Sequence, residues 1–349
     1  NKEKNLDATK QPMFFGDDLA VQRYDTFKYP LFDKLTQQQL GYFWRPEEVS
    51  LQKDRNDYSQ LSEGQKFIFT SNLKYQTMLD SVQGRGPCLA FLPFVSLPEL
   101  EGAIVAWDFM ETIHSRSYTY IIKNLYSNPN EVFDTIIEDE KIAKRSKSVT
   151  QTYDELIDLG YKWHLDKSKV DLYELKKKMY LAMCTVNILE GLRFYVSFAC
   201  TFAFGELKLM EGSAKIISLI ARDEALHAKF AVEMFNMTEG LPQDKVHGIL
   251  KEAIEVEEQF VEQSLPERLE GLNKDTLKQY VRYCGNRLLK MLKGGKYDDI
   301  WLDKQPYEFM NMISIDSKTN FFEGRVDLYT KSRVGLDEKN NVFSLNSDF

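Results

Sequence analysis

The chain has 349 residues, of which 43% are hydrophobic, so it can bury a substantial core. Its formal net charge of −8 and its pI near 5.3 exclude a surface built to bind nucleic acid, and no basic cluster contradicts this. The four cysteines form neither a CxxC pair nor a secretory framework, so we expect a protein of the reducing cytoplasm.

The chain is expected to open with an irregular, polar N-terminal arm over residues 1–30. Apolar residues at helical spacing then predict a helix over residues 31–43. Pro46 should end this helix, because proline lacks the backbone N–H that a helix interior needs.

Two further helices have recognisable starts. Ser62, followed three residues later by Gln65, is the pattern of a capping box, so a helix should begin here and continue to about Gly84. Pro98 suits the first turn of a long helix, which should end before Pro129.

The second half of the chain continues the helical pattern, without strand periodicity or a linker. From about residue 316 onward the pattern fades into a polar tail. We therefore predict one all-α domain over residues 1–315 and a flexible C-terminal tail over residues 316–349. The remaining helices are expected over residues 130–160, 171–204 and 213–237, with two or three more between 243 and 293.

One segment has the length and composition of a membrane span. Residues Leu181 to Phe204 are almost wholly apolar, but Glu190 and Arg193 near the middle would be costly in lipid. Because the rest of the chain has the pattern of amphipathic helices, a helix buried on all sides within a bundle is the better interpretation.

The first candidate site lies in the helix predicted after Pro98. Glu111 and His114 are three residues apart, so both side chains share one helix face and can bind one metal ion. Tyr118 follows on the same face, about one turn, or roughly 5 Å, further along. A single Glu-x-x-His is a weak signal, because the pattern is common on ordinary helix surfaces.

The pattern occurs a second time, at Glu224 and His227. An acidic residue within an apolar helical segment precedes each copy: Asp80 stands 31 residues before Glu111, and Glu190 stands 34 residues before Glu224. One carboxylate from each of two helices and a Glu-x-x-His from each of two others form the ligand set of a dinuclear metal site in a four-helix bundle. The sequence therefore predicts such a site.

The ligand types indicate which chemistry the site can perform. Carboxylates with one imidazole per metal suit iron or manganese better than a structural zinc. Two trivalent ions, four carboxylates and one bridging oxide would be electrically neutral together, so the oxidised site could be buried. Tyr118 is the oxidisable side chain nearest to such a centre on its helix.

Four segments resemble the small, radical-generating subunit of class I ribonucleotide reductase. They are Leu73-Lys-Tyr-Gln-Thr, Glu111-Thr-Ile-His-Ser-Arg-Ser-Tyr118, Arg193-Phe-Tyr-Val-Ser-Phe-Ala-Cys200 and Ile220-Ala-Arg-Asp-Glu-Ala-Leu-His227. The resemblance extends from about Pro12 to Tyr329. It implies a ferritin-like helical bundle with an oxo-bridged di-iron centre, iron rather than manganese. The implied metal ligands are Asp80, Glu111, His114, Glu190, Glu224 and His227.

The same resemblance implies a stable tyrosyl radical on Tyr118, formed with dioxygen and passed to the large subunit, where ribonucleoside diphosphates are reduced for DNA synthesis. Trp44 and Asp223 match the inner steps of the electron-transfer route, and Tyr329 matches its step across the subunit boundary. The family also implies a homodimer. Residues 343–349 look like the C-terminal peptide that docks on the large subunit.

Two other classes of protein share parts of this pattern. A di-iron oxygenase or desaturase has the same ligands and fold, but it needs a substrate tunnel and has no use for a docking tail. A ferritin-type iron store binds iron without this chemistry, and it usually has a shorter chain that lacks Tyr118 and Trp44 in this context.

Overall fold

The computed structural model describes residues 7–17, 21–237, 243–265, 269, 271–292, 302 and 304–312. These residues form an all-α protein, as predicted, and among them β-pairing is limited to two isolated bridges, Phe14 with Val95 and Leu269 with Leu272. Tyr329 and the predicted tail over residues 316–349 lie outside the described residues.

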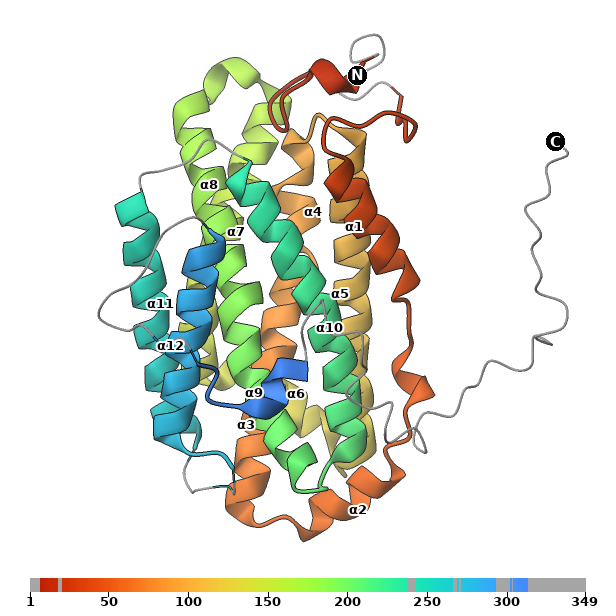
Figure 1. The fold of residues 1–349 in the computed structure, drawn as a ribbon, viewed down its shortest axis with the longest axis vertical. Helices are drawn as coiled ribbons and strands as arrows, with labels where there is room; N and C mark the ends of the chain where they lie inside the picture. The colour runs from red at the N-terminus through yellow and green to blue at the C-terminus, as the bar shows by residue number, and fades with distance from the viewer. Residues whose placement is uncertain are drawn as a thin grey trace, which may run out of the picture.

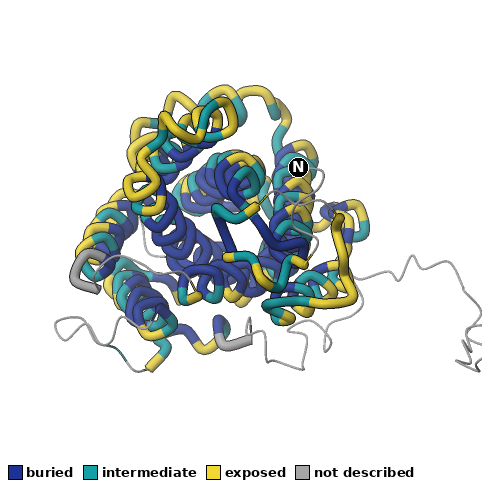
Figure 2. Tube along the Cα trace, turned by 90° about the horizontal axis from the view of Figure 1, so that it is seen from above, coloured by how far each residue is buried: buried dark blue, intermediate teal, exposed yellow. Residues whose placement is uncertain are grey.

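The long helices run side by side along the longest axis of the molecule (Figure 1). Seen from above, buried residues fill the centre of the bundle and exposed ones line its outer faces (Figure 2). The helices are α1 (Pro30–Gly41), α2 (Gln52–Gln60), α3 (Glu63–Gln83), α4 (Gly86–Ala90), α5 (Pro98–Leu125), α6 (Pro129–Glu138), α7 (Glu140–Leu165), α8 (Leu172–Ile188), α9 (Phe194–Glu206), α10 (Glu211–Asn236), α11 (Gln243–Ser264) and α12 (Lys274–Met291). Short 3-10 turns occupy Ala8–Lys10, Pro46–Glu48, Leu92–Phe94, Lys167–Lys169 and Glu308–Met312.

The predicted helix starts are confirmed. The Ser62 hydroxyl accepts from the Gln65 backbone N–H at 3.1 Å, and the Gln65 side chain accepts from the Ser62 N–H at 2.9 Å, which completes the capping box at α3. Pro98 is the first residue of α5. The short helices α2 and α4 are not among the predicted elements.

The helix expected over residues 130–160 is in fact two helices, α6 and α7. Asp139 separates them, because its carboxylate accepts from the backbone N–H groups of Lys141 and Ile142 and so caps the start of α7. An aspartate at this position favours a new helix start over a continuous helix.

The apolar segment near Glu190 is the central helix of the bundle, as predicted. Helix α8 continues into a π-helical turn, Leu189–Arg193, and then into α9. The continuous helix Leu172–Glu206 has the length and composition of a membrane span, but its apolar window is entirely buried inside the protein. A core helix passes the same test, and burial on all sides is the state found here.

Candidate metal centre

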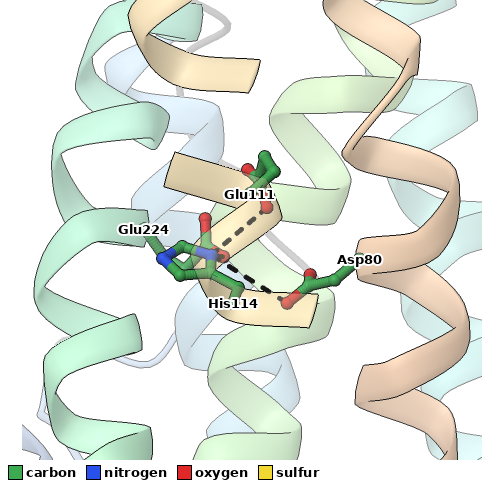
Figure 3. A group of neighbouring side chains, drawn as sticks. All are labelled: Asp80, Glu111, His114 and Glu224. Atoms are coloured by element: carbon green, nitrogen blue, oxygen red, sulfur yellow. Dashed lines mark hydrogen bonds and ion pairs between the residues drawn. The ribbon is translucent and has the colours of Figure 1, made fainter. Parts of the chain in front are cut away.

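Four helical segments bring the six predicted ligands together. Helix α3 contributes Asp80, α5 contributes Glu111 and His114, the π-helical turn contributes Glu190, and α10 contributes Glu224 and His227. All six side chains are at most 1% exposed. The carboxylates of Asp80, Glu111 and Glu224 converge on His114 (Figure 3).

The two glutamates of the Glu-x-x-His pairs are shared between the two histidines. His114 Nδ1 lies 3.2 Å from Glu111 Oε2 and 3.1 Å from Glu224 Oε1. His227 Nδ1 lies 3.1 Å from Glu111 Oε1 and 3.0 Å from Glu224 Oε2. Each carboxylate therefore turns one oxygen toward each imidazole, so both glutamates would be shared by two ions held beside the histidines.

The six residues form two overlapping groups of four, in which potential ligand atoms lie within 4.8 Å of one another. Asp80 completes the group around His114, and Glu190 completes the group around His227. Two shared and two unshared carboxylates, with one imidazole for each group, match a dinuclear site with one position beside each histidine.

Each histidine has a polar partner at Nε2, on the side of the ring away from the carboxylates. His114 Nε2 donates to Asp223 Oδ2 at 3.3 Å, and the side-chain amide of Gln39 lies 2.8 Å from His227 Nε2. The distal nitrogens are thus engaged, and both Nδ1 atoms face the carboxylates. Partners of this kind fix the ring orientation of metal-binding histidines.

The charges of the cluster are strongly coupled. Burial, together with the neighbouring Glu111 and Glu224 carboxylates, raises the pKa of Asp80 well above its usual value, and burial and Glu224 do the same to the pKa of Glu190. Burial lowers the pKa of His227, but hydrogen bonds to Glu111 and Glu224 outweigh this effect and raise it to about 9. The cluster therefore needs positive charge, supplied either by protons or by cations.

The donor set fits a pair of metal ions. Both oxygens of Asp80 and Oε2 of Glu190 are buried without a hydrogen-bond donor. Buried polar atoms without partners are rare in proteins, because each one loses its hydration without compensation. Free carboxylate oxygens beside two imidazoles are what two cations would bind.

Metal binding should therefore compete with protons. In the metal-free protein the pKa of His227, raised to about 9, leaves a proton on this imidazole that an incoming ion must displace, so affinity for Co²⁺ or Mn²⁺ should rise with pH up to about 9. The metal-free fold should lose the contribution of His227 to its stability as pH rises from 6.5 through about 9, because the folded state binds more protons than the unfolded state there. Calorimetry in buffers of different ionisation enthalpy measures the protons released. Affinity that is independent of pH between 6 and 9 would contradict this expectation.

Tyr118 lies on α5 one turn beyond His114 and is fully buried. Its hydroxyl has no hydrogen-bond partner. Burial and then the charge of Asp80 raise its pKa well above the usual value, so the phenol keeps its proton and lies within the electrostatic reach of the cluster.

Trp44 connects to the cluster through Asp223. The buried indole donates from Nε1 to Asp223 Oδ2 at 2.8 Å, and the same oxygen accepts from His114 Nε2. The Arg222 guanidinium donates to Asp223 Oδ1 at 3.1 Å, which leaves Oδ2 to the two rings. Trp44, Asp223 and His114 thus form one hydrogen-bonded path from the protein interior near α1 to the cluster. Tyr329 lies outside the described residues.

The structure also adds site residues that the sequence analysis did not name. Tyr153 donates from its hydroxyl to Gln83 Oε1 at 2.7 Å, and Gln83 donates from Nε2 to Glu190 Oε1 at 2.6 Å. Trp107 donates to Glu111 Oε1 at 2.9 Å. Helical spacing could have indicated two of them, because Gln83 is three residues after Asp80 and Trp107 is four before Glu111.

The Tyr153 phenol should matter for metal affinity, because it keeps the Gln83 amide turned toward Glu190. Tyr153→Phe keeps the ring that packs against Gly86 but releases Gln83, so we expect divalent-metal affinity to fall by about tenfold while the protein stays folded. Titration with Co²⁺ followed by visible absorption measures this. Tyr161→Phe, on an exposed position of the same helix, is the control. Equal metal affinities in the two variants would show that the Tyr153 hydroxyl does not contribute to metal binding through Gln83.

A surface cavity of about 620 Å³ lies next to the cluster, between α3 and α5. Asp80, Ser81, Gly84 and Ser115 are among the residues that line it. The Asp80 side of the cluster is therefore the side nearest to solvent in this cavity.

Comparison with known proteins identifies the family. A family model described as the small chain of ribonucleotide reductase matches residues 22–301. The chain is 49% identical to ribonucleoside-diphosphate reductase 1 subunit beta of Escherichia coli O157:H7 over 303 residues, which cover 80% of this chain and 81% of the relative.

Solved structures agree at the level of the fold. The R2 subunit of ribonucleotide reductase from Clostridium botulinum has a TM-score of 0.76 at 22% identity, covering 87% of this chain and 94% of that one. The dimanganese(II)-NrdF of Streptococcus sanguinis has a TM-score of 0.67 at 20% identity, covering 85% and 99%. The matches along most of the sequence show that this chain belongs to the family of class I ribonucleotide reductase small subunits.

Proposed function

We propose that the chain generates and stores a tyrosyl radical on Tyr118 for a ribonucleoside-diphosphate reductase, of which it is the beta subunit. The observation that carries this proposal is the meeting of six buried ligands from four helical segments, with a buried phenol one turn further along α5. Asp80 and His114 would hold one ion, Glu190 and His227 would hold the other, and Glu111 and Glu224 would be shared by both.

Iron is the metal we propose. Hard carboxylate oxygens with one imidazole per ion suit both iron and manganese. The combination of Asp80 and Tyr118 resembles the di-iron, tyrosyl-radical subclass, and this favours iron over manganese. When bound, the iron pair supplies oxidation by dioxygen, and the residues around it control where the oxidising equivalent goes.

Tyr118 is placed to lose one electron and one proton. The metal pair, when bound, would supply the oxidising power that takes up this electron, and Asp80, the charged group with the largest influence on this phenol, would accept the proton. The buried surroundings of Tyr118 keep out water and reductants, so the radical persists.

The radical leaves through Trp44, Asp223 and His114. Hydrogen bonds of 2.8 and 3.3 Å join these three groups, so an electron and a proton can move along one path. Tyr329 is proposed to continue this path to the large subunit, which binds the ribonucleoside diphosphate and reduces it to a deoxyribonucleotide for DNA synthesis. We propose that the complete enzyme works in the cytoplasm.

Residues 1–315 are proposed as the helical domain and residues 316–349 as the tail that docks on the large subunit. Removal of residues 343–349 should leave the radical intact and weaken binding to the large subunit, because spaced apolar side chains in a polar segment suit reversible docking. Surface plasmon resonance with the large subunit measures the affinity. Unchanged affinity after truncation would show that residues 343–349 do not dock on the large subunit.

A homodimer is supported by an apolar surface patch on α5, the end of α1 and the residues just after it. Leu40, Phe43, Val105 and Phe109 are each about half exposed, and the rings of Phe43 and Phe109 stack with centroids 6.2 Å apart. Exposed apolar groups that gather on one face commonly mark a protein interface. Analytical ultracentrifugation would show whether the particle has twice the mass of the chain.

Electron paramagnetic resonance tests the central proposal. Addition of ferrous iron and dioxygen to the metal-free protein should produce the signal of a tyrosyl radical. This signal should rise as fast as the iron is oxidised. Iron that binds and oxidises without an organic radical would instead indicate an iron store or an oxygenase.

A further inference from the structure

A second buried tyrosine is connected to the metal centre. Tyr118 is influenced by Asp80 more than by any other charged group, whereas Tyr153 of α7 is linked by hydrogen bonds to Glu190. Asp80 and Glu190 belong to the two different groups of ligands described above. The Tyr153 side chain is buried, and burial followed by the charge of Glu190 raises its pKa well above the usual value. A protonated phenol is therefore close to each group of ligands.

The Gln83 side chain stands between Tyr153 and the ligand. The Tyr153 hydroxyl donates to Gln83 Oε1 at 2.7 Å, and Gln83 Nε2 donates to Glu190 Oε1 at 2.6 Å. Gln83 is the last residue of α3, and its side chain is fully buried. Because a carboxylate that binds metal only accepts hydrogen bonds, the amide must turn its NH₂ group toward Glu190 and its oxygen toward the phenol.

An amide in this position holds the phenol but does not take its proton. Oxidation of a buried phenol requires the proton to leave with the electron, since a positive charge left on the ring would be costly there. The oxygen of Gln83 is a weak base, and Nε2 would pass a proton to Glu190 only if the amide became an imidic acid. Asp80 beside Tyr118 is instead a carboxylate, which accepts a proton directly.

Another carboxylate near Tyr153 does not take the place of Gln83. Asp108 of α5 contributes to the raised pKa of Tyr153, but the hydroxyl donates to Gln83. Asp108 Oδ1 is buried without a hydrogen-bond partner, and the carboxylate interacts with the thiol and backbone N–H of Cys88. In the described part of the chain, the acceptor for the Tyr153 hydroxyl is therefore an amide.

We propose that Gln83 determines which tyrosine is oxidised, because its amide leaves Tyr153 without a proton acceptor and so reserves the oxidising equivalent for Tyr118. This inference rests on the proposed function. The metal pair, when bound, would supply the oxidising power, and only Tyr118 would lose both an electron and a proton. Gln83 acts through its hydrogen bonds to Tyr153 and Glu190, so it is a positioning residue.

Gln83→Glu keeps the size of the side chain and supplies the missing proton acceptor. An ionised carboxyl group takes up the Tyr153 proton directly. A protonated one accepts this proton at one oxygen and gives its own proton to Glu190 from the other. Tyr153 would then lose one electron and one proton and become a neutral radical, with the metal pair taking up the electron.

Electron paramagnetic resonance on the full-length protein, given ferrous iron and dioxygen, tests the proposal in variants that lack Tyr118. Tyr118→Phe alone should give no tyrosyl radical, whereas Tyr118→Phe with Gln83→Glu should give a new one with its own hyperfine pattern. Further replacement, Tyr153→Phe, should remove it. Tyr118→Phe with Gln60→Glu, the same charge change at the exposed end of α2, is the matched control and should give none. The radical is expressed per bound iron, so loss of metal is not mistaken for loss of the radical.

Two results would overturn the proposal. One is a Tyr153 radical in Tyr118→Phe with Gln83 intact, and the other is an iron-loaded Gln83→Glu variant without a Tyr153 radical. If Gln83→Glu binds no iron, Gln83→His replaces it, because an imidazole also accepts at one nitrogen and donates at the other.

Tyr118→Phe alone decides the case in which neither substitution at Gln83 retains iron. Mass spectrometry after exposure to dioxygen should find Tyr153 unmodified in that variant, and oxidised Tyr153 would overturn the proposal. The unsubstituted protein, measured in parallel, tests the proposed function separately. A Tyr118 radical there, together with failure in the variants, would reject the role of Gln83 and leave the proposed function intact.

Discussion

Replacement of Tyr118 by phenylalanine should abolish both the organic radical signal and nucleotide reduction, while the metal centre still assembles. The hydroxyl is the group that gives up the electron and proton, and phenylalanine is far harder to oxidise. Activity should fall to background, the largest effect expected of any single substitution in this chain. Electron paramagnetic resonance and a nucleotide reduction assay with the large subunit measure the two losses.

The same substitution should not harm the fold. The Tyr118 hydroxyl is buried without a hydrogen-bond partner, so its removal relieves an unsatisfied polar group, which typically costs about 1–3 kcal/mol. We therefore expect the melting temperature of Tyr118→Phe to be equal to or above that of the unsubstituted protein, with equal iron content. Full activity in this variant would refute the proposal that Tyr118 carries the radical. Loss of iron would show that the Tyr118 hydroxyl is needed to assemble the metal centre.

Replacement of Trp44 by phenylalanine should leave the tyrosyl radical in place but lower nucleotide reduction to below about 1%, equivalent to about 2.7 kcal/mol of transition-state free energy. The substitution keeps an aromatic ring in the buried position and removes the N–H that donates to Asp223 at 2.8 Å. The path from the cluster would then be broken at its outer end, whereas the contacts between His114 and Asp223 remain.

Trp163→Phe provides the matched control. Trp163 packs against Phe15 and Phe94, remote from the hydrogen-bonded path, so its replacement should leave reduction unchanged. The radical content per chain, measured in both variants, shows whether a loss of activity comes from failure to form the tyrosyl radical or from failure to transfer it. If Trp44→Phe reduced nucleotides at the normal rate, the path through Asp223 would not carry the radical.

Local sequence patterns predicted most of the fold and the candidate ligands. The Glu111–His114 and Glu224–His227 pairs are recognisable because three-residue spacing places both side chains on one helix face. The capping box at Ser62 and the proline at the start of α5 were equally local, and the structure contains both.

Contacts between distant segments could not be predicted in this way. Gln39 approaches His227 from another helix, and Tyr153 reaches Glu190 only through Gln83, so no spacing within one element connects these residues. Arg145 and Glu257 are likewise 112 residues apart, and their pairing follows from how α7 packs on α11. The break at Asp139 was missed because helical periodicity continues across it, while the capping aspartate sets the boundary.

The π-helical turn at Leu189–Arg193 sets the position of Glu190 on its helix. Its backbone N–H of Phe194 bonds to the Leu189 carbonyl five residues back, so the turn contains one residue more than an α-helical turn would. The wider turn takes up the extra residue, so the helix after it keeps nearly the phase of a regular α-helix that is one residue shorter. Deletion of one residue in the turn should therefore leave Phe194 and Phe198 facing the core and displace mainly Glu190, the ligand that the turn contributes. Such a deletion should weaken metal binding more than it destabilises the fold.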